Sequence, residues 1–76
     1  MLTRQADPAN ARSEEHLEVA LHNRLGGRVS NLQVIFHDAG LVLRGRAATY
    51  YAKQLAQHAA MELAGLNVLA NDIEVY

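Results

Sequence analysis

The feature that most constrains the fold is a helix-to-strand transition in the last third of the chain. An alanine-rich stretch with helical spacing ends at Gly65, and apolar side chains then recur at every second position. Glycine ends helices because it adopts the left-handed conformation at no steric cost. A period of two is typical of a strand with one buried face. We therefore predict a final strand over about residues 68–75, with Leu69, Ile73 and Val75 on its inward side.

The chain has 76 residues, which is enough for one domain. Half of the residues are apolar and there is no cysteine, so the core must stabilise the fold without disulfides. Seven basic residues, six of them arginine, oppose eight acidic ones, and the net charge is −1. A near-neutral domain has no strong electrostatic attraction to nucleic acid, so we expect no nucleic-acid partner.

The N-terminal part predicts a tail and then a helix. Residues 1–12 are polar and aperiodic, and we expect a flexible tail there, although Pro8 could start a helical turn. Ser13 with two glutamates after it is a good helix start, so the domain is predicted to span residues 13–76. The apolar stripe of this helix consists of Leu17, Ala20, Leu21 and Leu25. Gly26 and Gly27 are expected to end it.

The middle of the chain predicts a β-hairpin. Residues 31–37 alternate in polarity, with Leu32, Val34 and Phe36 on the side expected to be covered by helices. Residues 38–40 form the turn, and residues 41–46 form the partner strand.

A second helix should follow, capped by Thr49. Its apolar positions are Ala52, Leu55, Ala56, Ala59 and Leu63. The element order is α-β-β-α-β, and the predicted fold is an α+β two-layer sandwich with a three-stranded sheet and two helices on one face. The sequence leaves the strand order open.

Two segments together resemble the BON domain, a small bacterial α-β-β-α-β module of envelope and stress-related proteins. The hairpin pattern of that family is Asp/Asn-Gly, two apolar residues, a polar residue and Leu-x-Gly, and residues 38–45 read DAGLVLRG. The C-terminal pattern is Gly-Val-x-x-Val-x-Asn-x-Leu/Ile-x-Val, and residues 65–75 read GLNVLANDIEV. The chain departs from the pattern at Gly40, which comes one position late, and at Val42, which replaces the polar residue.

The resemblance covers about residues 13–76 and implies a non-catalytic binding module that interacts with phospholipid surfaces or with other proteins, envelope proteins included. It carries over no catalytic or ligand-binding motif. We therefore expect no enzymatic activity.

Three residues are expected to have structural roles. Gly45 faces the core, where the absence of a side chain would let a helix backbone come close. Gly65 ends the second helix. Asn71 lies on the inward side of the last strand, where its amide should hydrogen-bond neighbouring backbone.

The sheet face opposite the helices is the predicted interaction surface. Its residues are Gln33, Ile35, His37, Val42, Arg44, Arg46, Asp72, Glu74 and Tyr76. One interpretation is a solvated face with cross-strand ion pairs. The other is a contact surface, most simply for a homodimer, with Ile35 and Val42 at the centre and arginines at the rim.

A further alternative is peripheral binding to anionic phospholipid. The cations available for it are Arg24, Arg28, Arg44, Arg46 and Lys53.

The remaining chemistry-bearing residues form no recognisable site. The histidines are His16, His22, His37 and His58, and their spacing does not suggest shared metal ligands. The two serines, Ser13 and Ser30, fit cap and turn positions. We expect no catalytic residue, no metal and no cofactor.

No stretch approaches the ~20 apolar residues of a membrane helix. The first residues also lack the apolar core of a secretory signal. We expect a cytoplasmic location, or a periplasmic or membrane-peripheral one if a signal has been removed.

Overall fold

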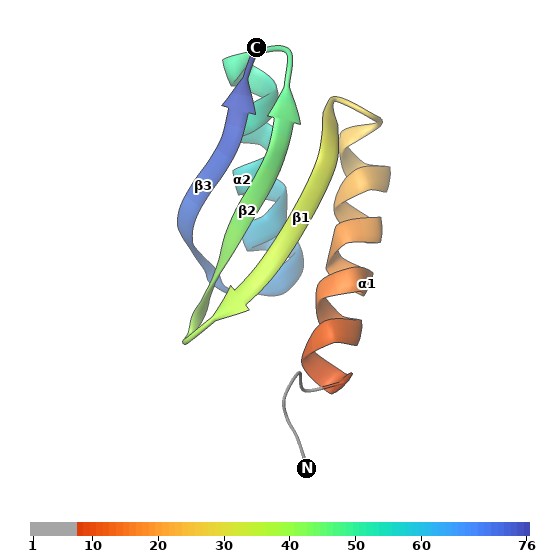
Figure 1. The fold of residues 1–76 in the computed structure, drawn as a ribbon, viewed down its shortest axis with the longest axis vertical. Coiled ribbons are helices and arrows are strands. Elements are labelled where there is room, and N and C mark those ends of the chain that lie inside the picture. Colours follow the sequence, from red (N-terminus) through yellow and green to blue (C-terminus); the bar gives the residue numbers. More distant parts are fainter. Residues whose placement is uncertain (1–7) are drawn as a thin grey trace.

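The computed structural model describes residues 8–76, with side chains from residue 13 onward. Its elements follow the predicted order α-β-β-α-β (Figure 1). They are α1 (Pro8–Leu25), β1 (Val29–His37), β2 (Gly40–Ala47), α2 (Tyr50–Ala64) and β3 (Asn67–Val75).

The first helix begins earlier than predicted. It starts at Pro8, five residues before Ser13, so residues 8–12 are helical and do not belong to a tail. Proline suits the first helical position because its missing N–H has no partner there in any case. The remaining part of the predicted tail, residues 1–7, lies outside the described residues.

The three strands form one mixed sheet in the order β1-β2-β3. β1 and β2 are antiparallel, which confirms the predicted hairpin, and β3 is parallel to β2 on its other side. In the turn between β1 and β2, Asp38 takes a positive φ of 54°. Aspartate tolerates this conformation better than most residues do, so the turn forms without glycine at that position.

Both helices pack against one face of the sheet, with α2 behind β2 and β3 and α1 beside β1 (Figure 1). The stripe of α1 is confirmed, since Leu17, Leu21 and Leu25 are buried. The rest of the core consists of Val29, Val34, Leu41, Leu43, Ala47, Ala52, Ala56, Ala59, Ala60 and Ile73. Alanines on the inner face of α2 let it lie close to the sheet.

Both ends of α2 are as predicted. The Thr49 hydroxyl accepts a hydrogen bond from Ala52 N at 3.0 Å, which caps the N-terminus. Gly65 adopts the left-handed conformation with φ 69°, and its N–H donates to Met61 O at 2.9 Å. One predicted core position is wrong: Leu63 is 42% exposed, and Ala60 is buried instead.

The inward residues of β3 differ from the prediction at both ends. The register of β3 against β2 shifts between Leu41 and Val42, so that Val68 packs on the core and Leu69 is exposed. A bulge of this kind reverses the alternation of side chains beyond it. At the other end Val75, predicted to be covered, is 45% exposed, because β3 is an edge strand.

Candidate functional site

The open face of the sheet brings the predicted interaction residues together. β1 contributes Gln33, Ile35 and His37, β2 contributes Val42, Arg44 and Arg46, and β3 contributes Asp72 and Glu74, with Tyr76 just beyond it. The alternate residues of each strand face the helices, so side-chain alternation fixes this set. The face is therefore a continuous surface built from all three strands.

An apolar row crosses the open face near the hairpin end. Ile35 pairs with Val42, and Val42 pairs with Ala70 on β3; all three side chains are half-buried. The exposed Leu69 extends this row, since its Cγ would lie 2.6 Å from a Cβ placed on Gly40. We call these residues, Ile35, Val42, Leu69 and Ala70, the apolar row. Leu69 was predicted to face the helices, because the bulge in β3 leaves no clear signal in the alternation of the sequence.

Two charged rows follow along the same strands. Arg44 pairs in register with Asp72, and Arg46 pairs with Glu74. The Arg46 guanidinium lies 4.0 Å from the Glu74 carboxylate and 4.7 Å from the centre of the Tyr76 ring. β2 therefore presents a column of cations, and β3 presents a matching column of anions.

Asn71 has the structural role that was predicted. Its Nδ2 donates to Lys53 O and to Gln57 Oε1, each at 3.1 Å, and its Oδ1 accepts from Ile73 N at 3.2 Å. The side chain thus joins β3 to α2.

Gly45 also has a structural role, but its close neighbour is a strand and not the predicted helix. A Cβ at this position would lie 3.0 Å from Ser30 O and 3.3 Å from Leu32 Cα. β1 bulges here, where its register shifts between Ser30 and Gln33, and Asn31 takes a positive φ of 53°. The missing side chain makes room for this bulge.

The outer edge of β1 is covered by two carboxylates from α1. Glu18 Oε2 accepts from Val34 N at 2.8 Å, and Glu14 Oε2 accepts from Phe36 N at 2.7 Å. Four helical residues advance about 6 Å and two strand residues about 7 Å, so glutamates four apart match alternate strand amides. From the sequence, Glu14 was expected only to favour the start of the helix, and nothing in the sequence pairs it with a strand.

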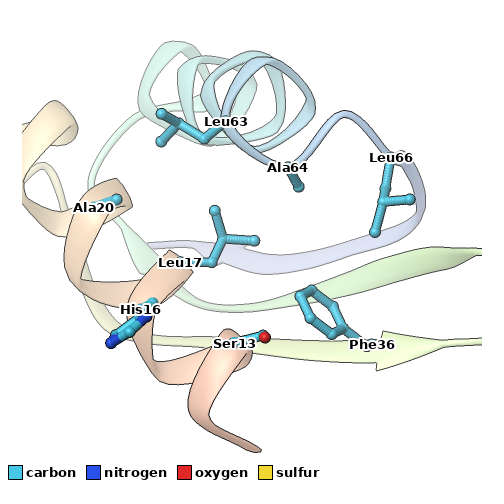
Figure 2. Close-up of a pocket in the computed structure, with 8 residues that line it drawn as sticks. All are labelled: Ser13, His16, Leu17, Ala20, Phe36, Leu63, Ala64 and Leu66. Atoms are coloured by element: carbon cyan, nitrogen blue, oxygen red, sulfur yellow. The ribbon is translucent and has the colours of Figure 1, made fainter. Parts of the chain in front are cut away.

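An apolar groove that was not predicted from the sequence lies between the two helices (Figure 2). Its volume is about 470 Å³, and its walls are Leu17, Ala20, Phe36, Leu63, Ala64 and Leu66, with Ser13 and His16 at the rim. It lies where the middle of α1 meets the last turn of α2.

The basic residues considered for lipid binding lie on different surfaces. Arg44 and Arg46 are on the open face, whereas Arg24 and Arg28 lie beside Leu55 and His58 of α2. Arg24 is paired with Glu62 at 2.9 Å. The described part of the chain therefore offers no single cationic surface.

Within residues 8–76 there is no cluster of three histidine, aspartate or glutamate side chains that could hold a metal ion. The helices described are also too short or too polar to cross a membrane. No family model, curated protein or solved structure matches the chain.

Proposed function

We propose that the protein is a non-catalytic, BON-like interaction module that associates with a second copy of itself through the open face of its sheet. The observation that carries this proposal is the register of β2 against β3. Val42 lies beside Ala70, Arg44 beside Asp72 and Arg46 beside Glu74. Each row therefore pairs two apolar residues or a cation with an anion, and the same pairs can form between two copies.

This register makes the open face complementary to itself. Two copies can stack face to face about a twofold axis that is parallel to the strands and runs between β2 and β3. β2 of one copy then lies over β3 of the other, with Arg44 opposite Asp72 of the second copy and Val42 opposite its Ala70. Stacked sheets pack about 10 Å apart with strands within about 30° of each other, which lets these side chains meet.

The apolar row supplies the apolar part of such an interface, at its hairpin end, and the charged rows lie beside it. Interfaces favour this arrangement, since apolar burial drives association while paired charges fix the orientation. Covering the face would also stabilise a domain of this size by mass action.

A pair of complementary variants tests the proposed geometry. Arg44→Asp gives a copy in which residues 44 and 72 are both acidic. Asp72→Arg gives a copy in which both are cationic. Each variant alone should be monomeric in sedimentation across a concentration series, because like charges would oppose each other. An equimolar mixture should associate, because each acid then faces a cation.

Val42→Glu is a second test, because it places a carboxylate opposite Ala70 of the other copy and should prevent association in every combination. A wild-type chain that stays monomeric at the highest soluble concentration would exclude the homodimer. Association of the wild type with no recovery in the mixture would exclude this axis.

Peripheral binding to anionic lipid receives less support, because the basic residues do not share a surface and Arg24 and Arg46 already face carboxylates. Co-flotation with anionic vesicles at low salt is the direct assay. Binding that disappears in an Arg44→Gln, Arg46→Gln variant would favour lipid over the second copy.

A further inference from the structure

The two edges of the sheet, β1 and β3, differ in how far other groups cover them. At β1, the carboxylates of Glu14 and Glu18 already accept hydrogen bonds from outward-facing amides. β3 is the opposite edge, and no described strand pairs with its outer side. A groove of about 550 Å³ runs along β3 beside Lys53 of α2. An unpaired edge is a template for another strand.

The outward main-chain groups of β3 can be identified. Tyr76 N donates to Ala47 O at 3.0 Å, so this residue points toward β2. Successive residues of a strand point to opposite sides, which directs the N–H and C=O groups of Asn71, Ile73 and Val75 outward. The hydrogen bond from Ile73 N to the Asn71 side chain agrees with this direction, and it occupies one of these three outward amides.

The side chains around this edge have opposite charge on the two faces of the sheet. Asp72 and Glu74 are exposed on the open face, whereas Lys53 lies on the helix side of the groove. An added strand would therefore fit best with cations at every second position and neutral residues between them. Cross-strand pairs of opposite charge stabilise such pairing.

The acidic side chains of β3 also argue against a second copy at this edge. Antiparallel pairing of β3 with itself about Ile73 would place Asp72 beside Glu74 of the other copy on the open face. Like charges directly opposite each other are destabilising.

All three tyrosines of the chain lie near Ala47, where β2 and β3 end. Tyr50 and Tyr51 begin α2 shortly after Ala47, and Tyr76 hydrogen-bonds to Ala47. Their exposed fractions are 64%, 68% and 67%, in that order. Exposed tyrosine is favoured in protein interfaces because it combines apolar area with a polar end.

We propose that the outer edge of β3 binds an extended segment of a partner protein that has basic residues at alternating positions. The segment adds a fourth strand, its cations lie beside Asp72 and Glu74, and its neutral residues face Lys53. This site shares Asp72 and Glu74 with the proposed dimer interface, but its main-chain contacts lie on the outer edge of β3 and not on the open face.

The test is an NMR titration of the labelled protein with a synthetic peptide of alternating lysine and threonine. A peptide of the same composition with its lysines in one block is the matched control. The alternating peptide should protect the amides of Asn71 and Val75 from hydrogen exchange and shift their resonances. The blocked peptide should bind roughly tenfold more weakly, because it cannot place its cations on one face.

Two variants assign the binding to this edge. Val75→Pro removes an outward N–H at a position where an edge strand tolerates proline, and it should abolish binding. Val75→Thr retains the N–H and should leave binding unchanged. Asp72→Asn with Glu74→Gln keeps every main-chain group and should weaken binding about tenfold.

Equal affinity for the two peptides, or shifts confined to the apolar row, would overturn the proposal. Repeating the titration on Val42→Glu separates this site from self-association. That variant should lose the dimer and keep the peptide, so the failure of one proposal is distinguishable from the failure of the other.

Discussion

Asn71 uses both ends of its side-chain amide to link β3 with α2. The nitrogen donates to Lys53 O and Gln57 Oε1, and the oxygen accepts from Ile73 N. A half-buried amide with three partners at 3.1–3.2 Å fixes the position of α2 along the strand.

Replacing Asn71 with alanine should therefore destabilise the fold. We expect a loss of about 1–3 kcal/mol in the free energy of unfolding, because the partners lose their hydrogen bonds. Urea denaturation followed by circular dichroism measures the change. Asn67→Ala is the control, since Asn67 is an exposed asparagine of the same strand. Equal losses in both variants would contradict a specific role for Asn71.

At the scale of elements, α1 serves as a cover for the edge of β1. Glu14 and Glu18 should matter more than other acids of the helix, because each accepts from a strand amide. Hydrogen bonds to charged acceptors contribute about 1.5–3 kcal/mol when they are protected from water. We expect Glu14→Ala with Glu18→Ala to accelerate hydrogen exchange at Val34 and Phe36.

The matched control for this pair is Glu15→Ala, since Glu15 is exposed on the same helix. Glutamine at positions 14 and 18 should restore part of the protection, because its amide oxygen can still accept. Unchanged exchange in the double alanine variant would show that water replaces the carboxylates without cost.

The start of α2 depends on a single side-chain contact. The Thr49 hydroxyl is the acceptor for Ala52 N. Thr49→Ala should lower the free energy of unfolding by about 1 kcal/mol, whereas Thr49→Ser keeps the acceptor and should change it little. Thermal denaturation of the two variants provides the comparison, and similar midpoints would argue against the cap.

The elements that were predictable are those with a local signal. Thr49, Gly65 and the buried stripe of α1 can be read from capping chemistry and spacing, and the hairpin from its alternation. The start of α1, the bulge that exposes Leu69 and the neighbour of Gly45 were not predicted correctly. Bulges depend on how two strands pair, and one sequence contains no record of that pairing.

In the candidate site too, the features with a local signal in the sequence were predictable and those that depend on tertiary pairing were not. Alternation predicted which residues share the open face, because side-chain direction is a local property. The matching of Arg44 with Asp72 and of Arg46 with Glu74 required the register of two parallel strands separated by α2. The carboxylates on the β1 edge and the groove between the helices also required tertiary placement.

At the scale of the whole molecule, the helical layer is incomplete at one end. Figure 2 shows the methyl group of Ala64 directed into the groove between Leu17, Phe36 and Leu66. The groove exposes side chains that a tighter helix pair would bury, and Leu63 beside it is 42% exposed. This end of the core therefore contributes less than its apolar composition allows.

Ala64→Leu should fill the groove and stabilise the fold. The added carbons contribute about 0.8 kcal/mol for each buried CH₂, and partial burial should give a gain of about 1 kcal/mol in the free energy of unfolding. Ala48→Leu adds the same atoms at an exposed position and should give no gain. Denaturant unfolding of both variants measures the difference, and a loss of stability in Ala64→Leu would mean that the helices cannot accommodate a larger side chain there.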